Sequence, residues 1–177
     1  MKRKYEKSEY IYKGRKISLR LDSYKINGKH YTAEIVEHRG AIVILPIDND
    51  EVIFIRQYRY PLKDYILELP AGTLEPGEEP EKTAQRELIE ETGYKSHKLE
   101  LLGSFYASPG YTTEILYAFL ATNLEKTTPK PEEYEEIKIL RVNLDEVPLI
   151  IARNEIRDAK TLAAFMLYYA KIARNKF

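Results

Sequence analysis

Residues 72–94 read GTLEPGEEPEKTAQRELIEETGY. This segment begins as a glycine-containing loop and continues with the character of a short helix. Pro80 suits the start of that helix, because a proline at the first helical position leaves no N–H unpaired. Gly93 suits its end, because glycine adopts the left-handed conformation of the C′ position at little cost. The segment therefore predicts a loop followed by a helix that begins at Pro80 and stops at Gly93.

The predicted helix carries three carboxylates on one face. Glu87 and Glu91 lie one above the other, whereas Glu90 lies a turn on from Glu87 and is rotated away. Ala84 and Leu88 form the opposite stripe, which would pack on a sheet. Clustered like charges destabilise a helix, and a divalent cation would remove the repulsion. Such oxygen donors suit Mg²⁺ or Mn²⁺ better than zinc. Taken alone, however, an acidic run of this kind favours a solvated helix face.

The whole segment resembles the Nudix box, G-x5-E-x7-R-E-U-x-E-E-x-G-U, in which U is an aliphatic or aromatic residue. All of the fixed polar and glycine positions are present, namely Gly72, Glu78, Arg86, Glu87, Glu90, Glu91 and Gly93, with Leu88 and Tyr94 at the apolar positions. A pattern of this length is far more specific than a short glycine-rich motif. The resemblance implies a Nudix hydrolase with the α/β/α sandwich and mixed sheet of that superfamily.

Composition narrows the class of protein further. The chain has 177 residues, about the length of one domain, and its formal net charge is zero. Balanced charge gives no electrostatic reason to expect a nucleic acid or an anionic membrane as a partner. No apolar run is long enough to span a bilayer, and the basic start is not followed by the apolar stretch of a signal peptide. The absence of cysteine excludes disulfides. We therefore expect a cytoplasmic protein.

Residues 1–38 are expected to form a small antiparallel β-sheet subdomain. Residues 16–21 and 31–36 alternate between apolar and polar side chains, and the Asn27-Gly28 pair between them is typical of a two-residue hairpin turn. So small a sheet has too little core to stand alone, so we expect it to pack on the main domain or on a second subunit. The Nudix domain is expected to occupy residues 39–177.

The rest of the chain reads as strands followed by helices. The pattern predicts strands at 41–47, 52–57, 65–69, 99–106, 114–121 and 137–142, a short helix at 145–152, and a last helix from Asp158 to about Arg174. Strand runs that are separated by one loop–helix unit and closed by a helix predict a layered α/β or α+β fold. The mixed sheet itself is implied by the resemblance.

The resemblance also implies roles for the residues of the box. Glu87 and Glu91 would be the main metal ligands, with Glu90 as a further ligand or a close catalytic support. The carbonyl of Ala71, at the entry of the loop, would be a backbone ligand. Other residues of the box would be structural, and an ion pair between Arg86 and Glu78 would hold the loop to the helix. These structural residues are Gly72, Glu78, Arg86 and Gly93.

Two features outside the box resemble the ADP-ribose pyrophosphatase subgroup. Pro109 lies sixteen residues after Gly93, where that subgroup carries a marker proline. The run Glu133-Tyr-Glu135 resembles its mobile acidic loop. By that match Glu133 would be the general base and Glu135 an additional metal ligand. Glu136 is an alternative base, because the match does not fix the register of the loop.

In addition to Pro109, three positions match residues of the subgroup that contact the substrate. They are Arg59 and Glu114, at the phosphates and the terminal ribose, and Arg39, which would reach over from the partner subunit of a swapped homodimer. The implied activity is the Mg²⁺-dependent cleavage of ADP-ribose to AMP and ribose 5-phosphate, with Mn²⁺ as an alternative metal. The other interpretations are the same chemistry on another nucleotide sugar or a dinucleotide, such as GDP-mannose or NADH, and a nucleotide sensor without turnover.

Overall fold

The structure, a computed structural model, describes residues 2–129 and 136–174. The chain forms two compact units, one of Met1–Gly40 with Phe105–Ile115 and the other of Ala41–Ser104 with Leu116–Phe177. No helix in the described part of the chain is long and apolar enough to cross a membrane.

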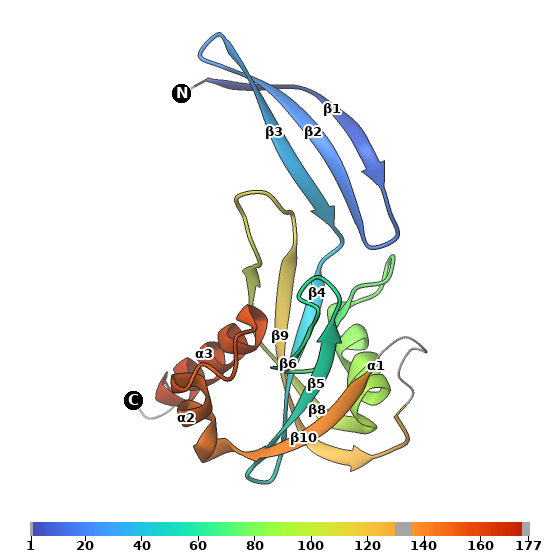
Figure 1. The fold of residues 1–177 in the computed structure, drawn as a ribbon, viewed down its shortest axis with the longest axis vertical. Helices are drawn as coiled ribbons and strands as arrows, with labels where there is room; N and C mark the ends of the chain where they lie inside the picture. Colours follow the sequence, from blue (N-terminus) through green and yellow to red (C-terminus); the bar gives the residue numbers. More distant parts are fainter. Residues whose placement is uncertain (1, 130–135, 175–177) are drawn as a thin grey trace. The chain divides into compact units, whose positions relative to one another are not determined.

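The first unit is built on a three-stranded antiparallel sheet in the order β1-β2-β3 (Figure 1). Its strands are β1 (Arg3–Lys13), β2 (Ile17–Ile26) and β3 (Lys29–His38). The predicted turn between the last two is confirmed, since Asn27 and Gly28 both have positive φ, 49° and 86°. Both values fit the two-residue turn that matches the natural twist of a hairpin.

The segment from Phe105 to Ile115 is hydrogen-bonded to the end of β3. The Val36 N–H donates to the Tyr111 carbonyl over 2.8 Å, and the Thr113 N–H donates to the Val36 carbonyl over 3.0 Å. The first unit therefore combines the N-terminal sheet with a segment from much later in the chain.

The second unit contains a seven-stranded sheet in the order β10-β5-β4-β9-β8, with β6 paired to β5 and β7 paired to β4. The bounds of its strands are β4 (Ala41–Asp48), β5 (Glu51–Arg59), β6 (Asp64–Glu68), β7 (Ala71–Thr73), β8 (Tyr94–Tyr106), β9 (Ile115–Lys126) and β10 (Ile137–Asn143). Strands β4 and β9 are parallel, whereas β4 pairs antiparallel with β5 and β7. The predicted mixed sheet is thus confirmed.

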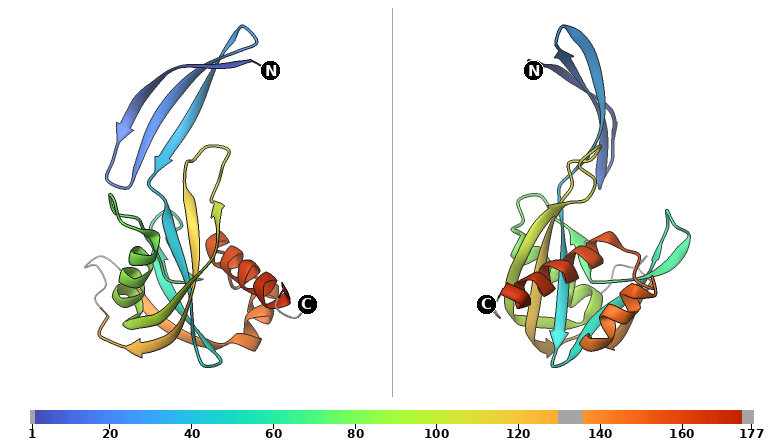
Figure 2. Two further views of the ribbon diagram at one scale, coloured as in Figure 1. Left: turned by 180° about the vertical axis from the view of Figure 1, so that it is seen from behind. Right: turned by 90° about the vertical axis from the view of Figure 1, so that its left-hand side faces the viewer.

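Helices lie on both faces of this sheet, as Figures 1 and 2 show for α1 on one face and α3 on the other. The helical elements are α1 (Pro80–Thr92), the 3₁₀ turn η1 (Leu144–Glu146), α2 (Val147–Ala152) and α3 (Ala159–Arg174). The core under α1 consists of Ile42, Ile44, Ala84, Leu88, Phe119 and Ala121. On the other face, Phe165 of α3 stacks on Phe54, with ring centroids 5.8 Å apart. The three layers confirm the α/β/α sandwich.

The ends of α1 follow from its sequence. Pro80 occupies its first turn, and the preceding Glu79 is extended and makes no side-chain cap. At the other end Gly93 adopts the left-handed conformation, with φ 68°, and its N–H donates to the Ile89 carbonyl. A glycine there avoids the clash that a Cβ would bring. These ends set the length of the helix that carries the carboxylates.

Candidate active site

The loop that leads into α1 meets one carboxylate of that helix through its backbone. Ala71, the first residue of β7, pairs with Val43 of β4. Its N–H donates to Oε2 of Glu91 over 2.9 Å. The Glu91 residue is only 3% exposed. The loop and the helix therefore hold a buried carboxylate at the loop entry, directly beside the Ala71 peptide.

A second carboxylate lies against the next residue of the loop. A Cβ at Gly72 would stand 2.0 Å from both Cδ and Oε1 of Glu87. Only glycine allows so close an approach of a side chain to the backbone. Glu87 and Glu91 thus converge on two consecutive residues, Ala71 and Gly72.

Arg86 joins three carboxylates around the same loop. Its Nε and Nη2 donate to Glu78 over 3.1 and 3.0 Å, and its Nη1 donates to Glu87 over 2.7 Å and to Glu90 over 3.0 Å. The hydrogen bonds from Arg86 lower the pKa of Glu78 to about 2. The same hydrogen bonds raise the pKa of Arg86. The sequence-predicted ion pair of Arg86 with Glu78 is therefore present, and it ties the loop to α1.

These residues offer the donor chemistry of a divalent cation site. Within residues 2–129 and 136–174, no three acidic or histidine side chains surround a common point. Two carboxylates from one helix and the peptide oxygen of Ala71 are nevertheless hard oxygen donors, which Mg²⁺ and Mn²⁺ prefer. A buried carboxylate also gains from a nearby cation. The residues present at the loop thus fit a divalent metal ion.

Arg59, at the end of β5, lies in an ionic cluster around one buried carboxylate. Its Nε and Nη2 donate to the two carboxylate oxygens of Glu68, each over 2.7 Å, and Lys160 of α3 contacts the same carboxylate. Glu68 is fully buried. Glu68 and Lys160 were not predicted from the sequence to be functional residues. The usable signal was a charged residue in the apolar run Ile66-Leu67-Glu68-Leu69, since a charge in such a run needs a partner.

The predicted acidic loop lies partly outside the described residues. Glu133 and Glu135 are not among the described residues. Glu136 accepts a hydrogen bond from the Tyr65 hydroxyl. This contact raises the pKa of Tyr65. It places Glu136 at β6, the strand that leads into the loop before α1.

The remaining predicted substrate residues belong to the first unit. Glu114 lies 3.6 Å from Nδ1 of His38, and Pro109 is exposed in a turn that the Tyr111 N–H closes on the Ser108 carbonyl. Arg39 lines a hollow of about 310 Å³. The charged side chains around this hollow are mainly basic: Lys13, Arg15, Lys16, Glu37 and Arg39.

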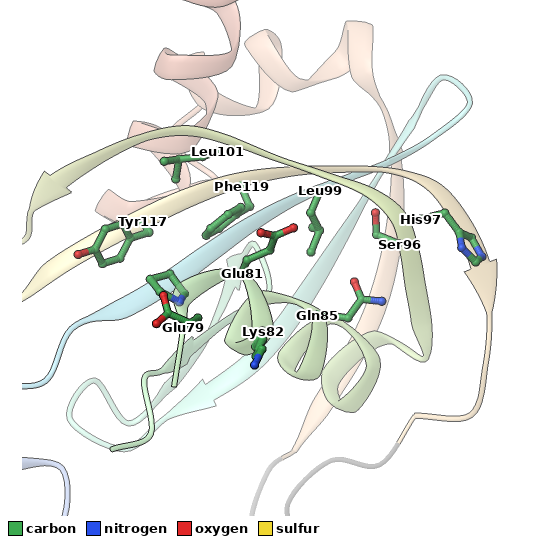
Figure 3. Close-up of a pocket in the computed structure, with 11 residues that line it drawn as sticks. Glu79, Glu81, Lys82, Gln85, Ser96, His97, Leu99, Leu101, Tyr117 and Phe119 are labelled. Carbon is green, nitrogen blue, oxygen red and sulfur yellow. The ribbon is translucent and has the colours of Figure 1, made fainter. Parts of the chain in front are cut away.

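A separate cavity of about 720 Å³ lies beside α1 in the second unit (Figure 3). Gln85 forms part of one wall, and Tyr117 and Phe119 of β9 line it as well. Two residues along an α-helix turn through about 200°. Gln85 and Glu87 therefore point to different sides of α1, and this cavity is distinct from the carboxylate site.

Changing Gly72 to Ala is expected to displace the Glu87 carboxylate while the fold persists, because the added methyl meets a side-chain end. Turnover should fall about 10²-fold, as for a misplacement of about 1 Å. A Mn²⁺ titration followed by electron paramagnetic resonance, together with turnover, checks this result. Gly103→Ala is the matched control, since its Cβ would meet only the Leu167 side chain at 3.3 Å. Unchanged Mn²⁺ affinity in Gly72→Ala would contradict the role of Glu87.

Known proteins resemble this chain in sequence and in fold. The family model described as NUDIX domain matches residues 36–165. An ADP-ribose pyrophosphatase of Bacillus subtilis (strain 168) is 41% identical over 168 residues, which cover 93% of this chain and 90% of that protein. A protein of Bacillus methanolicus named methanol dehydrogenase activator is 40% identical over 162 residues, covering 89% and 88%. The chain belongs to the Nudix family.

A solved structure shares the same fold. A crystal structure of an ADP compounds hydrolase superposes with a TM-score of 0.87, covering 99% of this chain and 96% of that chain. The two sequences are 23% identical, so this likeness concerns the fold alone.

Proposed function

We propose that this protein is a Nudix hydrolase that cleaves the diphosphate of ADP-ribose to AMP and ribose 5-phosphate with Mg²⁺, or with Mn²⁺ in its place. The observation that carries the proposal is the convergence of Glu87 and Glu91 on the loop at Ala71 and Gly72. The choice of ADP-ribose is supported by the 41% identity to the Bacillus subtilis protein named ADP-ribose pyrophosphatase.

The proposed metal site uses the Glu87 and Glu91 carboxylates and the Ala71 carbonyl, with Glu135 as a further ligand. A bound divalent cation would neutralise charge on the diphosphate and acidify a water molecule. Arg86 holds Glu87 and Glu90 in place, since its Nη1 donates to both. Glu90 is assigned as a catalytic support for the two ligands Glu87 and Glu91, which lie on the same helix.

The proton of the attacking water needs a base. We assign this role to Glu133, or to Glu136 if the register of the acidic loop differs. The hydrogen bond from Tyr65 supports a place for Glu136 near β6. A carboxylate within hydrogen-bond reach of the water would orient it and accept its proton.

Substrate contacts are assigned to four residues of the chain. Arg59 would donate to the phosphates, because a planar guanidinium matches the geometry of phosphate oxygens. Arg39 would act from the partner subunit of a homodimer, and its basic surroundings suit an anionic group. Glu114 would accept from the terminal ribose near Pro109. We also expect the protein to be cytoplasmic.

The test is hydrolysis of ADP-ribose, GDP-mannose, NADH and diadenosine polyphosphates, each with Mg²⁺ and with chelator. We expect ADP-ribose to be the best substrate and chelator to abolish turnover. Preference for another compound would keep the chemistry and reject the substrate. Tight binding without turnover would instead support a sensor and contradict the proposed enzyme.

The name of the Bacillus methanolicus relative favours a second candidate function, the activation of a methanol dehydrogenase. Its identity to this chain, 40%, is close to that of the Bacillus subtilis protein. Adding this protein to a purified methanol dehydrogenase, with and without Mg²⁺, tests the candidate. An unchanged dehydrogenase rate would exclude it.

A further inference from the structure

The first turn of α3 fixes the position of one lysine. Lys160 Nζ lies 3.0 Å from Oδ1 of Asp158, while Oδ2 of Asp158 accepts from the Thr161 N–H over 3.0 Å and from its hydroxyl over 2.6 Å. The Thr161 hydroxyl oxygen also accepts from the Leu69 N–H over 2.9 Å. Thr161 and Leu69 are fully buried. Lys160 is therefore held at the end of β6, next to the loop that enters the active site.

Lys160 and Arg59 share one buried carboxylate. Glu68 accepts hydrogen bonds from Nε and Nη2, on one edge of the Arg59 guanidinium, and contacts the Lys160 ammonium through Oε2. Two cations around a fully buried carboxylate offset the cost of removing its charge from water. Bidentate bonding also fixes the plane of the guanidinium, which a single hydrogen bond would not do.

Arg59 keeps part of its guanidinium available toward solvent. Among the described residues its Nη1 makes no hydrogen bond, and its side chain is 35% exposed. Burial lowers the pKa of Arg59, but the hydrogen bonds and charge of Glu68 and the charges of Glu91 and Asp158 raise it overall. Glu68, which holds Arg59, lies three residues before Ala71 in the chain. Arg59 is therefore held next to the loop of the proposed metal site.

We propose that Glu68 and Lys160 are positioning residues, which hold the Arg59 guanidinium so that its remaining N–H groups bind a diphosphate oxygen next to the loop at Ala71. The identity of the diphosphate rests on the proposed function. A guanidinium that is already oriented loses less conformational entropy when it binds, so the ligand binds more tightly. Without Lys160, Glu68 retains one cationic partner, and both side chains gain freedom to reorient.

The experiment compares Lys160→Met with Lys160→Arg, in the full chain with Mg²⁺. Calorimetry measures the Kd of ADP, which carries a diphosphate, and steady-state kinetics measure KM and kcat for ADP-ribose. We expect Lys160→Met to raise the Kd of ADP and the KM about tenfold, with a much smaller change in kcat. Lys160→Arg should restore most of the affinity, because it restores the cation.

Lys171→Met is the matched control, since Lys171 lies on the same helix and pairs with Glu100. It should leave the Kd of ADP unchanged. Affinities are measured where melting curves show every variant to be folded. If Lys160→Met does not fold, Asp158→Asn replaces it, because this change loosens Lys160 and keeps an acceptor for Thr161.

The outcomes separate this inference from the proposed function. A lower melting temperature with unchanged ADP affinity would show that the cluster only ties β6 to α3, and would overturn the inference. If the wild-type protein does not hydrolyse ADP-ribose, the proposed function fails, whereas the ADP affinities still decide whether Lys160 positions Arg59. Weaker ADP binding in Lys160→Met alone, with rescue by arginine, would support it.

Discussion

Glu91→Gln is expected to remove most of the activity while the protein remains folded. The residue is 3% exposed and accepts the Ala71 N–H, and a glutamine oxygen can accept the same hydrogen bond. What disappears is the negative charge beside the loop, which the proposed metal site needs. We expect kcat to fall by about 10²–10³-fold, the size of effect seen when a preorganised electrostatic contact is lost.

Turnover, Mn²⁺ affinity and the melting temperature together check this prediction. Mn²⁺ should bind at least about tenfold more weakly to Glu91→Gln, since a carboxylate ligand has been replaced by a neutral amide. Glu81→Gln is the matched control, because Glu81 is exposed in the first turn of the same helix. It should behave like the wild type. Full activity in Glu91→Gln would reject the proposed ligand.

Arg86→Met is expected to have the largest effect on stability. The change leaves Glu78, Glu87 and Glu90 without the guanidinium that all three contact. Removing one partner from a partly buried, bidentate ion pair leaves the other charges uncompensated, and we expect a loss of about 2 kcal/mol at pH 7. Arg157→Met is the control, since its pair with Asp64 is long, 3.8 Å, and exposed.

The loss in Arg86→Met should depend on pH in a defined direction. The folded-state pKa of Glu78 is about 2, below its ordinary value of 4.5. A lowered carboxylate pKa stabilises the fold above the unfolded-state pKa, and this contribution disappears as pH falls from about 4.5 toward 2. Urea unfolding at pH 7 and pH 3 should therefore show a smaller difference between wild type and variant at pH 3. An equal difference at both pH values would contradict the role of Glu78.

Several features of both units follow from local signals in the sequence. Pro80 and Gly93 predicted both ends of α1, and the Asn27-Gly28 pair predicted the turn between β2 and β3. Such signals depend on φ preferences and on neighbours within a few residues, so they act in the same way in any fold. The spacing of Glu87 and Glu91 likewise predicts that they lie on one side of a helix.

The partners of the buried charges depended on the tertiary structure. Glu68 and Lys160 are 92 residues apart, and their contact exists only because β6 and α3 pack together. The same holds for the inclusion of the segment Phe105–Ile115 in the first unit. Alternation of side chains shows which face of a strand is buried, but not which strand lies beside it. The Nudix box and its helix could thus be predicted from the sequence. The cluster that holds Arg59 depends on long-range packing, because a buried charge needs a counter-charge, and only the fold decides which residue supplies it.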